Sequence, residues 1–144
     1  MRAAGFKCLI FIFTLGCGET SGNYDVEFNL IEDGCGFFDD DSFSNDTWGV
    51  VFDENQSLFI ELGANEEGLT ECYQSEDSYT CEEQFELELE NGAILGKDMY
   101  LNLTFDRGSF TGAEQLDYSC IGDVDCMMED LPCSASVEVT GTIQ

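Results

Sequence analysis

The stretch MYLNLTFDRGSFTGAEQLDY, residues 99–118, decides the fold class. Over 99–105, apolar side chains alternate with polar or amphipathic ones. A period of two is typical of a β-strand that buries one of its two faces. Asp106-Arg107-Gly108 is a turn signal, and a second strand-like segment follows over 109–118. The sequence therefore predicts an antiparallel hairpin.

The same alternation recurs along the chain from residue 24 onward. Polar turns at 53–56 and 74–78 separate two further pairs of alternating segments. The strand-like segments are 24–30, 48–52, 58–62, 69–73, 79–89, 99–105, 109–118 and 133–143. Seven or eight short strands separated by turns predict an all-β fold, either an antiparallel up-and-down barrel or a sandwich. We expect one disulfide-stabilised β domain over 24–144.

Segment 79–89 is the only one with a competing helical interpretation, because Glu and Leu favour helices. A helix would stack Glu82, Glu86 and Glu90 at i,i+4 spacing, where like charges repel. A strand places those three in water and leaves Glu83 as the one acid on the inner face. The strand is therefore preferred, with inward side chains at Tyr79, Cys81, Phe85, Leu87 and Leu89.

The N-terminus has the pattern of an export signal. Arg2 and Lys7 precede a short apolar run over 8–15, which ends at small residues. Residues 1–16 are interpreted as a secretory signal peptide. The run is too short to cross a bilayer, which takes roughly 20 helical residues.

The junction Leu15-Gly16-Cys17 resembles the lipobox of bacterial lipoproteins. The resemblance covers only this segment and departs from the usual pattern, because Thr14 stands where leucine is expected. It implies that Cys17 carries lipid and becomes the new N-terminus, with 17–23 as the lipidated cysteine and a flexible tether. Simple cleavage without lipid is the alternative, and it gives a free extracellular protein.

The cysteine count favours lipidation. Of eight cysteines, one leaves with the signal, and a lipidated Cys17 leaves an even number for disulfides in an oxidising compartment. The six are Cys35, Cys72, Cys81, Cys120, Cys126 and Cys133. Cys72 and Cys81 lie in facing arms of one hairpin and are the first expected pair. Cys120 with Cys133, and Cys35 with Cys126, are the expected remaining pairs, although spacing alone leaves other connectivities open.

Charge and composition exclude several classes of function. The chain has 31 acidic and four basic residues, for a net charge of −27. After signal removal only Lys97 and Arg107 remain against the 31 acids, for a net charge of −29. Such a domain is not expected to bind nucleic acid or an anionic lipid surface. The absence of histidine removes the commonest general base.

One acidic loop is a candidate calcium site. Asp39, Asp41 and Asp46 lie within a single loop, and calcium prefers oxygen ligands. The loop lacks the EF-hand order of ligands, so a solvated loop is the competing interpretation. Phe37, Phe38 and Phe43 in the same loop either cap the sheet or present a binding edge. Apart from calcium, no cofactor is expected.

The sequence thus predicts an exported, highly acidic β domain, lipid-tethered at Cys17 to an outer membrane or cell surface. We expect a non-catalytic binding or structural role, with a protein partner at the cell surface. A barrel that carries a small ligand or calcium is the first alternative. A carboxylate-type hydrolase is the second, although with 31 acids any carboxylate pair is a weak signal.

Overall fold

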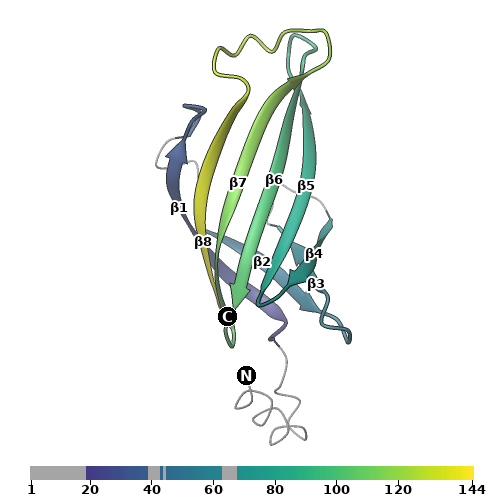
Figure 1. The fold of residues 1–144 in the computed structure, drawn as a ribbon, viewed down its shortest axis with the longest axis vertical. Helices are drawn as coiled ribbons and strands as arrows, with labels where there is room; N and C mark the ends of the chain where they lie inside the picture. The colour runs from purple at the N-terminus through teal and green to yellow at the C-terminus, as the bar shows by residue number, and fades with distance from the viewer. Residues whose placement is uncertain (1–18, 39–42, 44, 63–67) are drawn as a thin grey trace, which may run out of the picture.

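The protein folds as a closed eight-stranded antiparallel barrel (Figure 1). A computed structural model describes residues 19–38, 43, 45–62 and 68–144. Each strand pairs with the next along the chain, and β8 pairs with β1 to close the wall. The strands are β1 (Gly22–Asp33), β2 (Asp46–Phe52), β3 (Leu58–Glu61), β4 (Leu69–Ser75), β5 (Ser78–Glu88), β6 (Ile94–Phe105), β7 (Ser109–Ile121) and β8 (Cys133–Ile143). The predicted all-β fold is confirmed, as a barrel with eight strands.

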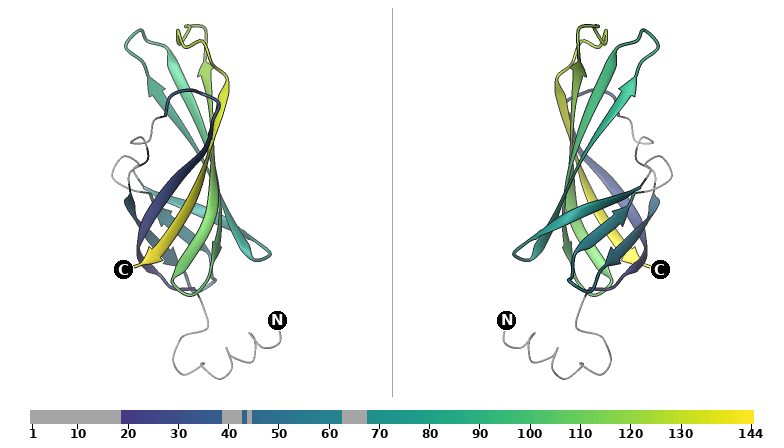
Figure 2. Two further views of the ribbon diagram at one scale, coloured as in Figure 1. Left: turned by 90° about the vertical axis from the view of Figure 1, so that its left-hand side faces the viewer. Right: turned by 90° about the vertical axis from the view of Figure 1, so that its right-hand side faces the viewer.

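The wall of the barrel is much taller on one side than on the other. β5 to β8 and β1 are long, whereas β2, β3 and β4 are short (Figures 1 and 2). β1 pairs with β2 only over 22–26, and β4 pairs with β5 only over 72–75 and 78–81. Beyond those pairs the wall continues as a five-stranded sheet in the order β5-β6-β7-β8-β1.

The two ends of the barrel are therefore different. We call one the closed end: the chain turns there at 53–57, 76–77 and 106–108, β1 begins there and β8 ends there (Figure 1). The open end is opposite and is formed by the tall sheet with residues 34–38, 89–93 and 122–132. β1 and β5 to β8 extend between these two ends, whereas β2, β3 and β4 stop short of the open end. The position of a side chain along a long strand therefore decides which end it lies near.

Aromatic side chains fill the closed half of the barrel. The rings of Trp48 and Phe110 stack with centroids 5.8 Å apart, and Phe105 lies 5.2 Å from Phe110. Tyr24 packs against both Phe110 and Phe105, at 5.5 and 6.0 Å. Gly141 lies opposite Phe110 in the β7–β8 register, and a Cβ there would collide with the ring. The alternation predicted these inward side chains because one face of each strand faces the core.

Segment 79–89 is a strand, as predicted, but its inner face is only partly buried. Tyr79 and Cys81 are buried, Glu83 and Phe85 are half-buried, and Leu87 is 60% exposed. The expectation that Leu87 is buried is wrong. The reason is that β4 no longer pairs with β5 at this point, so β6 is the one described strand that pairs with β5 at Leu87.

The disulfides confirm one predicted pair and correct two. Cys72–Cys81 forms as expected, with the two residues directly opposite in the β4–β5 register. The other bonds are Cys35–Cys133 and Cys120–Cys126, so the expected pairs Cys120–Cys133 and Cys35–Cys126 are wrong.

The β1–β8 pairing explains these corrections. It sets Asp33 opposite Ala135, and the Gly34 N–H donates to the Ser134 carbonyl at 2.9 Å. Barrel closure therefore brings the residues after β1 to the start of β8, although they lie about a hundred positions away in the chain.

Candidate binding site at the open end

The inner face of the tall sheet is apolar but incompletely covered. In register across β5, β6 and β7 lie Phe85, Lys97 and Tyr118, and beyond them Leu87 and Leu95. All five are half-buried or exposed, in contrast to the buried aromatic residues of the closed half. Their exposure follows from the short β2–β4 wall. This surface is the candidate binding site.

A turn at Asp33 places two aromatic residues against this surface. The Asp33 carboxylate accepts hydrogen bonds from the backbone N–H groups of Cys35 at 3.0 Å, Gly36 at 2.8 Å and Phe38 at 3.0 Å. Burial by itself would raise the pKa of Asp33, but these backbone donors lower it below the usual value. The resulting turn sets Phe37 and Phe38 beside the Tyr118 ring, at 5.4 and 6.1 Å.

Phe43 joins the same group of rings. Its ring lies 4.9 Å from Phe38 and 6.2 Å from Phe28 on β1. The side chains of Phe28, Phe38 and Phe43 pack against the core cluster and stay only partly buried. Of the two interpretations left open for this loop, capping of the sheet is what these contacts provide.

The inner face also carries charge. Lys97, one of the two basic residues beyond the expected signal, has its Nζ 4.9 Å above the centroid of the Phe85 ring. This is the distance of a cation–π contact. Glu83 is half-buried on the same face, and Glu114 is buried deeper in the barrel. The site can therefore hold both apolar and charged groups of a ligand.

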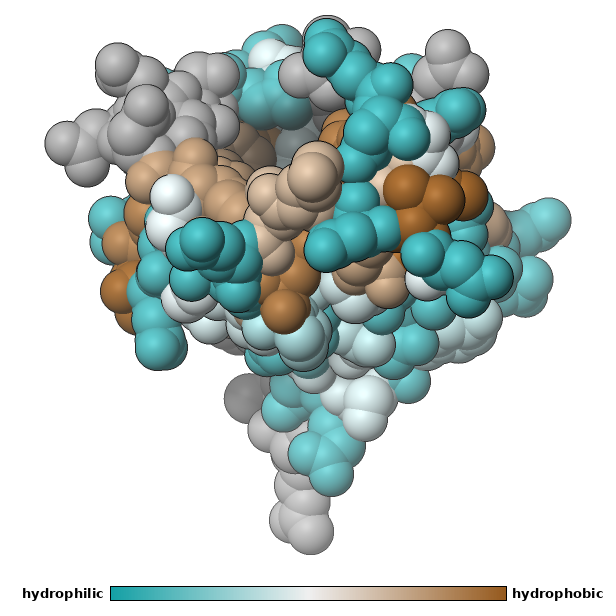
Figure 3. All heavy atoms as spheres, turned by 90° about the horizontal axis from the view of Figure 1, so that it is seen from above, coloured by the Kyte–Doolittle hydropathy of each residue, from teal (hydrophilic) through white to brown (hydrophobic). Residues whose placement is uncertain are grey.

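Exposed apolar side chains surround the open end. Large ones near this end include Ile31, Leu87, Ile121, Val124 and Met127, of which Met127 is 81% exposed. Asn91 Nδ2 donates to the Asp125 carbonyl at 2.9 Å and ties the β5–β6 turn to the β7–β8 loop. Viewed from this end, apolar residues lie around a hollow, with hydrophilic residues between them (Figure 3). Clustered exposed apolar residues mark interaction surfaces more often than scattered ones do.

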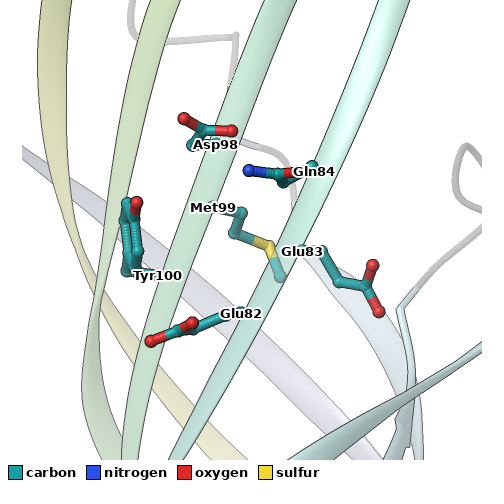
Figure 4. Close-up of a pocket in the computed structure, with 6 residues that line it drawn as sticks. All are labelled: Glu82, Glu83, Gln84, Asp98, Met99 and Tyr100. Carbon is teal, nitrogen blue, oxygen red and sulfur yellow. The ribbon is translucent and has the colours of Figure 1, made fainter.

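A groove of about 350 Å³ runs along β5 and β6. It is lined by Glu82, Glu83, Gln84, Asp98, Met99 and Tyr100. Glu82 and Gln84 point to one side of the sheet, and Glu83 points to the other (Figure 4). The groove thus lies where β5 has no second neighbouring strand among the described residues.

The sequence did not identify this edge as a functional feature. A signal for it was present, because the predicted arm 79–89 is about twice as long as its partner 69–73. A long strand paired with a short one must leave part of an edge unpaired.

The calcium prediction involves residues that the structure covers only in part. Asp39 and Asp41 lie outside the described residues. Asp46 begins β2, and its Oδ1 accepts a hydrogen bond from the Thr47 N–H at 2.8 Å. Within the described ranges, no group of three or more His, Cys, Asp or Glu side chains is arranged to hold a metal ion.

The predicted signal peptide and Cys17 also lie outside the described residues. Of the expected tether 17–23, Gly22 and Asn23 belong to β1. The Thr20 carbonyl accepts a hydrogen bond from Tyr24 Oη at 2.6 Å, and Ser21 Oγ accepts one from the Phe52 N–H at 2.8 Å. The part of the chain that the structure describes contains no helix long and apolar enough to cross a membrane.

The closed end holds one perturbed carboxyl group. Burial, and next the nearby Asp106 carboxylate, raise the pKa of Glu19, although the Arg107 N–H donates to it and acts in the opposite direction. Burial and the Glu19 charge in turn raise the pKa of the Tyr24 and Tyr79 hydroxyls. These groups lie where the chain enters the barrel, far from the open end.

Comparison of the chain with protein-family models, with curated proteins and with solved structures gave no match in any of the three.

Proposed function

We propose that this is an exported, lipid-tethered, non-catalytic domain that binds a partner at the cell surface through its open end. The observation that carries the proposal is the separation of the two ends. The chain enters at the closed end, and the incompletely covered apolar surface lies at the opposite end (Figures 1 and 3). A tether at Cys17 would therefore leave the open end free to meet a partner.

The distances support this arrangement. Thr20 is hydrogen-bonded to the barrel, so a lipidated Cys17 would be separated from it by three peptide units, at most about 11 Å. The 13 residues of β7 extend about 40 Å along the strand. A lipid anchor would thus hold the closed end near the membrane and present the open end outward.

Two experiments on intact cells test the proposal. The intact mass of the membrane-bound protein is expected to start at Cys17 with acyl chains attached, and Cys17→Ala should release the protein from the membrane. An unacylated N-terminus in the membrane-bound protein would contradict the tether.

A photocrosslinking residue tests the open end. Placed at Met127, it should give a discrete crosslinked product, whereas the same residue at Glu54, in the closed-end turn, should give none. Both positions are exposed, so accessibility is matched. Equal crosslinking from the two positions would contradict binding through the open end.

A small-ligand carrier is the second candidate, favoured by the half-buried surface of Phe85 and Tyr118 beside Lys97. The aromatic cluster occupies the closed half, so a ligand would have to lie at the open end. Tight retention of an apolar dye that Tyr118→Ala abolishes, without loss of folding, would favour this function. Dye binding unaffected by Tyr118→Ala would count against it.

A further inference from the structure

Part of the outer edge of β5 has no partner strand among the described residues. β6 pairs with β5 on one side over 79–88, and β4 pairs on the other side only over 78–81. Among the described residues, nothing pairs with 82–88 on that second side. In a strand, alternate residues direct their backbone N–H and C=O groups to the same side, so this edge presents a row of hydrogen-bonding groups to another strand.

The side chains along this edge are strongly acidic. Glu82, Glu86 and Glu88 lie on the outer face with Gln84, and Glu83 lies on the inner face. Across the sheet, Gln84 faces Asp98 on β6, which adds a further carboxylate. A second copy of β5 would bring several of these glutamates close to the glutamates of the first copy, and like charges directly opposite are destabilising. The edge thus disfavours pairing between copies of this chain.

The same side chains define the strand that would fit. Its outward residues would lie beside Glu82, Glu86 and Glu88, which favours Lys or Arg. Its inward residues would cover Phe85 and Leu87, which favours apolar side chains. The groove beside Glu82 also contains Tyr100, 41% exposed, whose ring can receive a cation among the carboxylates (Figure 4).

The other free edge of the tall sheet is less suitable. β1 has no β2 partner beyond residue 26, but its register shifts between Leu30 and Glu32. Such a bulge interrupts the row of backbone groups. The inner face of β1 at Phe28 is in addition covered by Phe43. The β5 edge is regular, and its inner face is open at Leu87.

We infer that the β5 edge, residues 82–88, takes up an extended segment of a partner protein as an additional strand, in which basic residues alternate with apolar ones. This inference rests on the proposed function and names the partner chemistry of the open end. Backbone pairing supplies the register, and the alternating carboxylates and apolar side chains supply the specificity.

The test uses the full-length mature protein and synthetic peptides. The probe is the capped peptide KVKVKVK. One control is KKKKVVV, with the same composition in blocks, and another is KVKVKVK with alternate backbone amides methylated to block strand pairing. We expect KVKVKVK to bind about tenfold or more tightly than either control. Equal binding of the block peptide would overturn the inference, because it would show attraction by charge alone.

Two variants locate the binding edge. Glu86→Lys with Glu88→Lys should weaken KVKVKVK binding about tenfold or more. Glu27→Lys with Glu138→Lys makes the same charge change on exposed residues of β1 and β8 and should change affinity by no more than about twofold. Greater weakening by the second variant would assign the strand to the β1 edge and overturn the inference.

Hydrogen exchange gives an independent readout. The peptide should slow amide exchange within 82–88 and leave the β1 edge at 27–33 unchanged, because only a paired edge gains hydrogen bonds. Binding without protection of 82–88 would overturn strand addition. If KVKVKVK does not bind but crosslinking from Met127 persists, this inference is wrong and the proposed function stands. Loss of that crosslink would contradict the proposed function itself.

Discussion

The two ends of this barrel are held together by different forces. At the closed end the wall is complete, and the aromatic cluster of Tyr24, Trp48, Phe105 and Phe110 is buried inside it. At the open end the described strands leave one side of the wall open, and there the chain is crosslinked by Cys35–Cys133 and Cys120–Cys126. The third bond, Cys72–Cys81, lies at the last β4–β5 pair before the edge of β5 becomes free.

The difference shows what an incomplete wall requires. Burial of apolar surface needs neighbours all round, and a half-open sheet cannot provide them. A disulfide stabilises mainly by restricting the unfolded chain and needs no enclosing wall. The open end can therefore keep an exposed apolar surface for binding and still stay folded. Substitutions at the two ends test this division between packing and crosslinking.

Removal of the long-range crosslink should cost the most. Cys35→Ala with Cys133→Ala opens a loop of 98 residues and should lower the free energy of unfolding by roughly 4–5 kcal/mol. The matched control, Cys120→Ala with Cys126→Ala, opens a separation of only 6 residues and should cost roughly 2 kcal/mol. Urea unfolding without reductant measures both. Equal losses would contradict loop closure as the cause.

Removal of one aromatic ring should destabilise the protein more at the closed end than at the open end, because the closed end is more tightly packed. Phe110→Ala empties a fully enclosed site and should cost about 3–5 kcal/mol. Phe85→Ala removes a half-buried ring at the open end and should cost about 1 kcal/mol, because part of that ring already contacts water. The comparison is made by urea unfolding of both variants. A loss at Phe85 as large as that at Phe110 would mean that the open end is also held by packing.

A single added methyl group tests how tightly the closed end is filled. Gly141→Ala should cost about 1–3 kcal/mol, because its Cβ would collide with the Phe110 ring. Gly49→Ala is the control, since a Cβ there meets only Glu61 at 3.4 Å. Addition of Phe110→Leu to Gly141→Ala should recover part of the stability that Gly141→Ala loses, as measured by thermal unfolding. No recovery in the double variant would show that the ring is not the cause.

At the open end, acid should weaken the turn at Asp33. Its pKa is lowered in the folded protein, so its carboxylate stabilises the fold above the ordinary value of 3.8. That contribution is lost as the pH falls through the lowered pKa. Asp33→Asn should therefore lower the melting temperature at neutral pH and reduce its decline in acid. An unchanged acid profile in the variant would exclude this turn as a contributor.

At the closed end, substitution of Glu19 should change stability in the opposite direction from substitution of Asp33, and by the smallest amount. Its pKa is raised above 4.5, so its charge disfavours the fold at neutral pH, and the penalty disappears as the pH falls through the raised pKa. Glu19→Gln should stabilise the protein at pH 7 by less than about 1 kcal/mol, because the residue is only partly buried and solvent screens its charge. The difference in melting temperature between variant and parent should vanish in acid. Destabilisation of the protein by Glu19→Gln at pH 7 would contradict a raised pKa of Glu19.

Part of this structure was predictable because it depends on neighbours close in the chain. The period-two alternation at 99–105 and 48–52 identified strands and their inward faces, and the polar turn at 53–56 identified a hairpin. Cys72–Cys81 was predictable for the same reason, since one hairpin sets both residues. The site was less predictable: Leu87 follows the alternation, and its exposure depends on how far β4 continues beside β5.

The strands, the hairpins, the acidic outer face and the exclusion of histidine chemistry follow from the sequence alone. They depend on composition and on the alternation of apolar and polar residues over a few positions. The pairing of β8 with β1, the Cys35–Cys133 bond and the lack of a described partner strand along Glu82–Glu88 of β5 emerge only in the folded chain. These features depend on contacts between residues far apart in the chain. Local side-chain patterns carry little information about such contacts, because many pairings of strands and cysteines bury the same inward faces.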